Sequence, residues 1–174
     1  RFIERDAGVP IPDEEAYDYI IHLASNADPR SYALYPAETI ITNMTGTLNV
    51  LNYARRHPGC RVLFTSTFEV YGEIPDRSCL SEEDYGLIDY NQIRSGYPES
   101  KRTAELLVRS FVEEYGADAV IARLSSIYGP TMTKGDNKAA AQFIRRAAAG
   151  QDIVLKSKGN QRRSYCYVAD ACAG

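Results

Sequence analysis

A tyrosine and a lysine stand four residues apart in the segment GYPESK, residues 96–101. On a helix this spacing places the side chains of Tyr97 and Lys101 one turn apart on the same face. A free tyrosine has a pKa near 10, and a nearby ammonium lowers that pKa because it stabilises the phenolate. The pair therefore predicts a phenol that exchanges a proton with a substrate. The alternative is a surface pair on a solvated helix, and the spacing alone does not separate the two.

Hydroxyl side chains in a second segment suit the same chemistry. Thr65, Ser66 and Thr67 follow the apolar residues 62–64. A hydroxyl from this segment could bind a substrate oxygen beside the phenol. A hydroxyl, a phenol and an ammonium together suit hydride transfer to or from an alcohol, because the alcohol loses its proton as its carbon loses hydride. The hydride acceptor is normally a nicotinamide, so the pattern predicts NAD as the cofactor.

These side chains must be positioned by strands and helices that alternate along the chain. Short apolar runs predict five strands, over residues 17–23, 62–64, 119–122, 153–155 and 165–168. Apolar residues at helical spacing predict three helices, over residues 36–56, 97–115 and 140–150. Strands that alternate with helices indicate an α/β fold, with a parallel sheet that is covered on both faces.

Polar or turn-forming residues follow the first three predicted strands, after Leu23, Phe64 and Ala122. In parallel sheets, ligands bind at the carboxyl ends of the strands. We therefore expect these three loops to line one site.

The composition argues against several classes of protein. With 174 residues, of which 44% are hydrophobic and 25% charged, the chain can bury one core. No apolar run approaches the roughly 20 residues of a membrane span, and no leader is seen, so we expect a cytoplasmic protein without a membrane partner. A net charge of -3 predicts no binding to nucleic acid. The four cysteines are scattered without a CxxC motif, so we expect free thiols and no metal site.

Six segments resemble, in their order and spacing, those of the extended short-chain dehydrogenases, the NAD-dependent nucleotide-sugar epimerases and dehydratases. They are YDYIIHLAS, NMTGTLNVLNYAR, FTSTFEVYG, YPESKRTAE, ARLSSIYGP and QRRSYCYVAD. The resemblance runs from about Asp6 to the last residue. It implies a Rossmann-like doubly wound parallel sheet, with a partial NAD-binding domain over residues 1–130 and the start of a substrate-binding lobe over residues 131–174. It also implies a fragment, since the glycine-rich loop of the family's first strand has no counterpart in the chain.

The resemblance implies roles for four catalytic residues. Tyr97 would be the base, and Lys101 would lower its pKa and contact the cofactor ribose. Thr67 would bind the reacting oxygen. Glu69 matches a glutamate that both the UDP-glucuronate decarboxylases and the dTDP-glucose 4,6-dehydratases keep.

The resemblance also implies binding residues. Those for the cofactor are Asp6, Leu23, Ala24, Ser25, Asn43, Thr65, Tyr97 and Lys101. Residues 23–25 would form the loop over the pyrophosphate, Asn43 would support the cofactor side, and Asp6 could approach the adenine. For a nucleotide-diphosphate sugar, Arg163 would face the diphosphate, because its planar fork suits phosphate oxygens. Ser126 stands where the family usually has an asparagine that contacts the nucleotide.

Several functions stay open within this resemblance. The chain looks most similar to the UDP-glucuronate decarboxylases, and Phe68 stands where the dehydratases have an aspartate proton donor. Decarboxylation, epimerisation and dehydration would share a first step, in which the sugar C4 hydroxyl is oxidised to a 4-keto intermediate. The alternatives are a dTDP-glucose 4,6-dehydratase-like enzyme and a non-catalytic domain that serves association or ligand binding. The resemblance also implies a homodimer that forms through helices 36–56 and 97–115.

Overall fold

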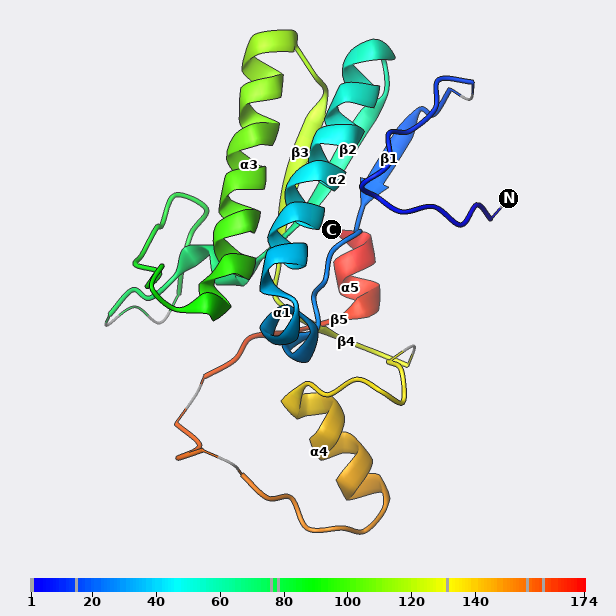
Figure 1. Ribbon diagram of the computed structural model, residues 1–174. Coiled ribbons are helices and arrows are strands. Elements are labelled where there is room, and N and C mark those ends of the chain that lie inside the picture. The colour runs from blue at the N-terminus through cyan, green and yellow to red at the C-terminus, as the bar shows by residue number, and fades with distance from the viewer. Residues whose placement is uncertain are drawn as a thin grey trace. The chain divides into compact units, whose positions relative to one another are not determined.

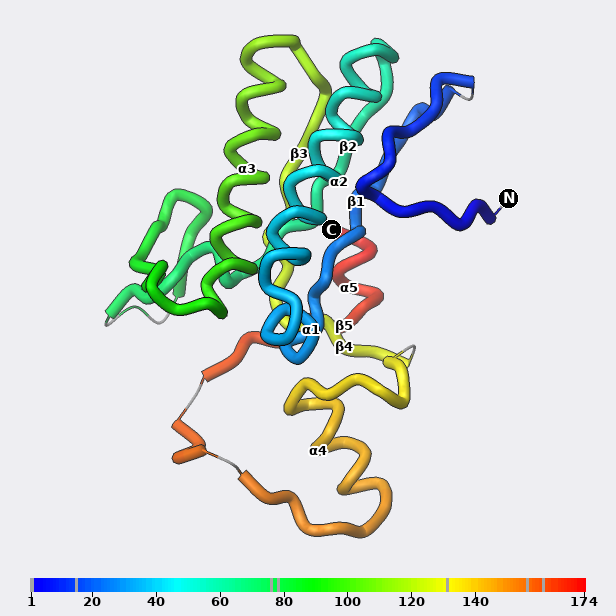
Figure 2. Tube along the Cα trace, in the orientation of Figure 1, coloured from blue at the N-terminus to red at the C-terminus, as the bar shows by residue number. Residues whose placement is uncertain are grey.

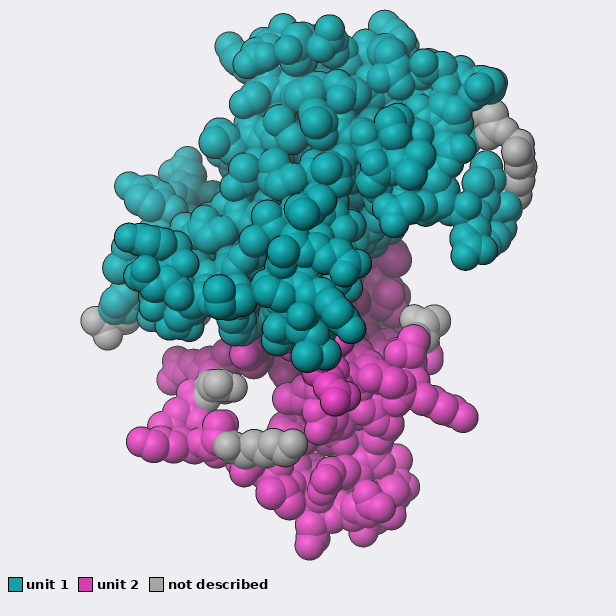
Figure 3. Space-filling model, viewed as in Figure 1, with its two compact units in different colours: residues 1–27, 31–123 teal, residues 28–30, 124–174 magenta. Residues whose placement is uncertain are grey.

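Two compact units make up the computed structural model. Unit 1 comprises residues 1–27 and 31–123, and unit 2 comprises residues 28–30 and 124–174 (Figure 3). The structure describes residues 2–14, 16–75, 77, 79–130, 132–155, 157–160 and 162–174. The assignment of a cofactor domain to residues 1–130 and a substrate lobe to residues 131–174 stays a prediction.

Unit 1 is built on a three-stranded sheet in the order β1-β2-β3, with β1 at Tyr19–His22, β2 at Arg61–Thr67 and β3 at Ala119–Leu124. Strands β1 and β2 are parallel, and their register pairs His22 with Phe64. The three strands predicted for this part of the chain are therefore confirmed. Strand β2 continues to Thr67, so the three predicted hydroxyl residues form its carboxyl end.

Two long helices, α2 (Pro36–Arg56) and α3 (Gly96–Tyr115), lie side by side against the sheet (Figure 1). The chain passes from β1 through the short helix α1 (Pro29–Leu34) and α2 before it reaches β2 (Figure 2). Both predicted helices are confirmed. Pro36 begins α2, and Gly116 ends α3 with a positive φ of 65°, a conformation that glycine adopts without steric cost.

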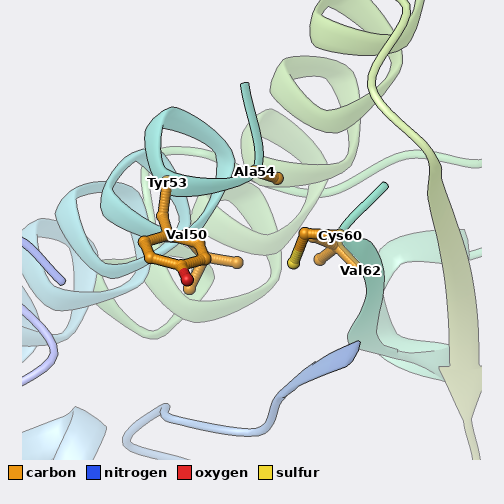
Figure 4. Close-up of a cluster of buried hydrophobic side chains, with 5 residues drawn as sticks. All are labelled: Val50, Tyr53, Ala54, Cys60 and Val62. Atoms are coloured by element: carbon orange, nitrogen blue, oxygen red, sulfur yellow. The ribbon is translucent and has the colours of Figure 1, made fainter. Parts of the chain in front are cut away.

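The core of unit 1 fills the space between these helices and the sheet. One cluster, drawn in Figure 4, consists of Val50, Tyr53, Ala54, Cys60 and Val62. A second cluster consists of Leu51, Phe64, Ala104, Val108 and Phe111. Each fully buried aliphatic or aromatic side chain contributes about 1.5–3 kcal/mol, so these clusters hold β2 against the two helices through Val62 and Phe64. On the opposite face of the sheet, Tyr19, Ile21 and Val120 are exposed.

The segment between β2 and α3 contains two 3₁₀ helices, η1 (Phe68–Tyr71) and η2 (Ile93–Ser95). Arg102 of α3 ties this segment down, since its guanidinium donates hydrogen bonds to the backbone oxygens of Val70 at 2.6 Å and Gly86 at 2.7 Å. These bonds hold η1 close to the first turns of α3.

Unit 2 contains two paired parallel strands, β4 (Ser126–Tyr128) and β5 (Tyr165–Tyr167). Its helices are α4 (Ala139–Ala148) and α5 (Val168–Ala173). The predicted helix 140–150 and the predicted strand 165–168 are thus confirmed, as α4 and β5.

The predicted strand at residues 153–155 is wrong, because these residues form no regular secondary structure. Their side chains are 48–62% exposed, and within the described ranges no strand pairs with them. An apolar run becomes a strand only where a neighbour completes its hydrogen bonds.

None of the helices in the described part of the chain is long and apolar enough to cross a bilayer.

Candidate active site

Tyr97 lies in the first turn of α3 and is buried, with 8% of its surface exposed. The side chain of Thr67, the last residue of β2, acts on the Tyr97 hydroxyl and lowers its pKa. The Tyr32 ring stacks on the Tyr97 ring, with 4.9 Å between the ring centroids and 13° between the planes. The structure therefore brings together the phenol and the hydroxyl that the sequence predicts, and it adds a second tyrosine.

The pKa of Tyr97 is raised to about 12, mainly because burial disfavours the charged phenolate. The hydrogen bond from Thr67 acts in the opposite direction, whereas the negative charge of Glu69 raises the pKa further. The expectation of a lowered Tyr97 pKa is thus wrong in this structure. The physical reason is that the loss of hydration around the phenol outweighs the stabilisation that the neighbouring groups provide.

Lys101 is buried, with 3% of its surface exposed. Its ammonium Nζ donates a hydrogen bond to the backbone oxygen of Thr65 at 2.9 Å and lies 4.8 Å from the centroid of the Phe64 ring. Burial lowers the pKa of Lys101 to about 8, and the carboxylate of Glu105 opposes this shift. Lys101 is therefore a buried cation held at the carboxyl end of β2.

The carboxyl ends of β1 and β2 are joined by side chains of the site. The Thr65 hydroxyl donates to the backbone oxygen of His22 at 2.8 Å. The neighbouring Ser66 is 6% exposed, and its Oγ is buried without a hydrogen-bond partner within the described part of the chain. A buried hydroxyl without a hydrogen-bond partner is a candidate to form a hydrogen bond with a ligand atom.

A chain of hydrogen bonds connects the loop after β1 to both helices. Ser25 Oγ donates to Asn43 Oδ1 at 2.7 Å, Asn43 Nδ2 donates to Ser100 Oγ at 2.9 Å, and Ser100 Oγ donates to the Tyr97 backbone oxygen at 2.8 Å. Asn43 is 1% exposed and Ser100 is 4% exposed, so the chain is shielded from water. Sequence reasoning missed Ser100, although its position three residues after Tyr97 on a helix was an available signal.

Glu69 lies in η1, two residues beyond Thr67, and its backbone N–H donates to Thr67 Oγ1 at 3.3 Å. Its carboxylate forms an ion pair with Arg94, with 3.2 Å between Oε2 and Nη2. Neither Arg94 nor Tyr32 was predicted from the sequence. Each comes from a segment without a recognisable motif, so nothing in the local pattern identified them.

The remaining predicted residues of unit 1 lie nearer its surface. Leu23 and Ala24 are exposed in the loop that follows β1, next to Ser25. Asp6 is also exposed, and its carboxylate accepts a hydrogen bond from the Gly8 backbone at 2.6 Å. Their proposed contacts with a cofactor stay predictions.

The two predicted nucleotide-binding residues belong to unit 2. Ser126 begins β4, and its backbone N–H donates to the oxygen of Ser164 at 3.3 Å. Arg163 is exposed just before β5. Both residues therefore lie near the starts of the paired strands β4 and β5, and their roles stay predictions.

Comparison with known proteins identifies the family to which this chain is related. The family model for the NAD-dependent epimerase/dehydratase family matches residues 3–174. UDP-glucuronic acid decarboxylase 6 of Arabidopsis thaliana is 41% identical over 157 residues, which cover 90% of this chain and 45% of that protein. UDP-glucuronic acid decarboxylase 1 of Xenopus tropicalis is 38% identical over 90% of this chain and 37% of its own length. The chain thus spans less than half the length of these relatives.

Superposition on solved structures agrees with the family match. The UDP-glucose 4-epimerase of Thermotoga maritima, determined with UDP-glucose, superposes with a TM-score of 0.79 at 26% identity, over 90% of this chain and 50% of that one. Pal from Bacillus thuringiensis superposes with a TM-score of 0.80 at 26% identity, over 92% of this chain and 50% of that one. Since the family model covers nearly the whole sequence, the chain belongs to the NAD-dependent epimerase/dehydratase family.

Proposed function

We propose that this chain carries the catalytic residues of an NAD-dependent enzyme that oxidises the C4 hydroxyl of a nucleotide-diphosphate sugar to a 4-keto intermediate. The observation that carries the proposal is the convergence of Tyr97, Thr67 and Lys101 at the carboxyl end of β2. The Thr67 hydroxyl acts on the phenol, and a buried ammonium lies one helical turn beyond the phenol. Lysine is almost never fully buried unless it is paired, so the burial of Lys101 favours a functional role.

The chain's residues fit a dinucleotide at this place. Lys101 has three N–H donors, of which the Thr65 carbonyl accepts one, so donors are left for ribose hydroxyls. The unpartnered Ser66 hydroxyl and the exposed loop at residues 23–25 offer further polar groups, and Asn43 holds Ser25 in that loop. When bound, NAD supplies a hydride acceptor for the carbinol carbon. Asp6 would face the adenine.

The protein's own part is to move the proton. In the proposed reaction Thr67 holds the sugar oxygen beside Tyr97, and the phenolate form of Tyr97 takes the hydroxyl proton as the carbonyl forms, which turns it into the phenol. Below pH 8 Lys101 is charged, and this charge favours the phenolate. Because the pKa of Tyr97 is raised to about 12, the phenolate is a minor form at neutral pH, and Tyr97 must release its own proton before it accepts that of the sugar.

Decarboxylation of UDP-glucuronate is the reaction that we favour. Relatives that are 36–41% identical are named UDP-glucuronic acid decarboxylases. A 4-keto sugar with a carboxylate on C5 is a β-keto acid and loses CO2 readily; the enolate that remains is then protonated at C5. Dehydration of dTDP-glucose is disfavoured, because Phe68 cannot donate a proton where the dehydratases have an aspartate. Ser126 and Arg163 would bind the nucleotide diphosphate.

The proposed assembly is a homodimer through α2 and α3. Large apolar side chains are exposed on these helices, among them Ile41 at 61%, Leu106 at 64% and Tyr115 at 46%. Paired helices that bury such a surface would form a four-helix bundle. The cytoplasmic location also remains a prediction.

Two experiments test the proposal. Calorimetry measures NAD binding to the chain and to a longer version extended at its N-terminus. Incubation of the longer protein with UDP-glucuronate, UDP-glucose or dTDP-glucose, followed by detection of released CO2 and new sugars, identifies the reaction. Tyr97→Phe should lower kcat by about 10²–10⁴-fold while NAD still binds, because only the proton-transfer group is removed.

Tyr90→Phe is the matched control, since this tyrosine is 82% exposed, and it should leave kcat unchanged. Undiminished turnover in Tyr97→Phe would remove this residue as the base. If neither protein bound NAD, the non-catalytic alternative would replace the proposal.

A further inference from the structure

Tyr32 covers one face of the proposed base. The centroids of the Tyr32 and Tyr97 rings are 4.9 Å apart, and only 3% of Tyr32 is exposed. A ring stacked at this distance excludes water from the face that it covers. Tyr32 therefore contributes to the burial of the Tyr97 phenol.

Arg94 of η2 contacts Tyr32 and Glu69 at the same time. Its Nη2 atom donates to the Tyr32 hydroxyl at 3.4 Å and lies 3.2 Å from Oε2 of Glu69. The guanidinium carbon is 5.8 Å from the centroid of the Tyr32 ring, within range of a cation–π interaction. Arg94 thus fixes the position of both neighbours.

These contacts connect five residues in a closed circuit, in which each residue interacts with the next. Tyr97 interacts with Thr67, whose hydroxyl accepts the backbone N–H of Glu69. Glu69 pairs with Arg94, Arg94 bonds Tyr32, and Tyr32 stacks on Tyr97. Each of the five residues interacts with two of the others, so a displacement of the Tyr97 ring would disturb both its stack on Tyr32 and its interaction with Thr67.

The charges around Tyr97 are balanced by the same circuit. Glu69 of η1 is the acid that disfavours the phenolate, and Arg94 of η2 pairs with this acid. Lys101 of α3 is a further charged group of the site, and the carboxylate of Glu105 acts on it. Loss of Arg94 would leave the Glu69 charge uncompensated near the phenol.

We infer that Tyr32 and Arg94 are positioning residues for Tyr97: Arg94 holds the Tyr32 ring, and the Tyr32 ring keeps the Tyr97 phenol at Thr67. A substrate oxygen must then reach the phenol at its hydroxyl end, beside Thr67, because one ring face is covered. The inference rests on the proposed role of Tyr97 as the base.

The first test measures the protonation of Tyr97 in the chain itself. With ¹³C at the tyrosine Cζ atoms, each phenol is titrated by NMR, and the Tyr97 signal is the one that Tyr97→Phe removes. Tyr32→Ala should lower the pKa of Tyr97 from about 12 towards the ordinary value of about 10, because water reaches the uncovered ring. Tyr32→Phe keeps the ring but loses the hydroxyl that Arg94 contacts, so the pKa of Tyr97 should fall less than in Tyr32→Ala.

The matched control is Tyr35→Ala. Tyr35 is three residues away and 57% exposed, so its removal should not change the Tyr97 titration. Circular dichroism at each pH confirms that the compared proteins are folded. An unchanged Tyr97 titration in folded Tyr32→Ala would overturn the inference.

The second test does not depend on the stability of the Tyr32 variant. The nuclear Overhauser effect between the Tyr32 and Tyr97 rings should weaken in Arg94→Ala, because the anchor of Tyr32 is lost. It should persist in Arg77→Ala, which removes a similarly exposed arginine that pairs with Asp84 at 2.7 Å. A full effect in Arg94→Ala would also overturn the inference. Since neither test needs NAD, a sugar or turnover, their failure is distinguishable from failure of the proposed function.

Discussion

Replacing Lys101 by methionine tests how much the burial of a cation lowers the free energy of unfolding. Burial lowers the pKa of Lys101 from 10.5 to about 8. One pKa unit corresponds to about 1.4 kcal/mol, so the charged form costs the folded protein about 3 kcal/mol at pH 7. Methionine has a similar volume and no charge, but it loses the hydrogen bond to the Thr65 oxygen, worth about 1 kcal/mol. We therefore expect Lys101→Met to raise the free energy of unfolding by about 2 kcal/mol at pH 7.

The sign of this effect depends on pH. Since the pKa of Lys101 is lower in the folded protein, the unfolded chain binds more protons between pH 8 and 10.5, and the stability of the original protein rises with pH in this range. The advantage of Lys101→Met should therefore shrink above pH 8 and become a deficit of about 1 kcal/mol near pH 10.5. Titration of Tyr97 affects both proteins in this range, so the difference between them isolates Lys101.

Urea unfolding followed by far-UV circular dichroism at pH 7 and pH 10 measures this difference. Lys134→Met is the control, because Lys134 is exposed, and it should stay within about 0.5 kcal/mol of the original protein at both pH values. If Lys101→Met were less stable by the same amount at both pH values, the burial of Lys101 would carry no charge penalty, and the reasoning would be refuted.

Two further predictions concern the stability of unit 1. Burial lowers the pKa of His22 to about 4, so between pH 6.5 and 4 only the unfolded chain takes up its proton, and stability should fall by up to about 3 kcal/mol in urea unfolding. His22→Gln should lose less over this range, and an equally steep loss would contradict the assignment. Gly72→Ala should cost more than about 2 kcal/mol, because φ is 68° and a Cβ would lie 2.6 Å from the Leu87 oxygen. Gly116→Ala, with a φ of 65° and open space around the Cβ, should cost only about 1 kcal/mol in the same thermal or urea assay, and equal losses would count against the clash.

The elements of the fold were predictable wherever the signal is local. Helix α2 follows from apolar spacing and from Pro36 at its start, and the structure confirms the predicted range 36–56. The failed strand at residues 153–155 shows the limit of this reasoning, because β-branched composition favours a strand but cannot provide its partner. Pairing is a property of two segments, and the sequence of one segment does not specify the other.

The site was predictable in part for the same reason. Tyr97 and Lys101 are neighbours on one helix, so their spacing alone placed them together. The contact between Tyr97 and Thr67 required the resemblance to the family, since the two residues lie on different elements. Tyr32 and Arg94 stayed hidden, because their roles arise from contacts between segments that are far apart in the sequence, whereas Ser100 was overlooked although its helical spacing from Tyr97 was a local signal.

What the sequence by itself determined is the kind of chemistry and its order along the chain: a phenol, an ammonium and a hydroxyl on an α/β scaffold, within a recognisable family. Tertiary structure alone decided the state of those groups. The stack of Tyr32 and the burial around Tyr97 and Lys101 move both pKa values away from their ordinary ranges, to about 12 and about 8. The physical reason is that hydration of a charged side chain depends on every atom packed around it, and those atoms are assembled only when the chain folds.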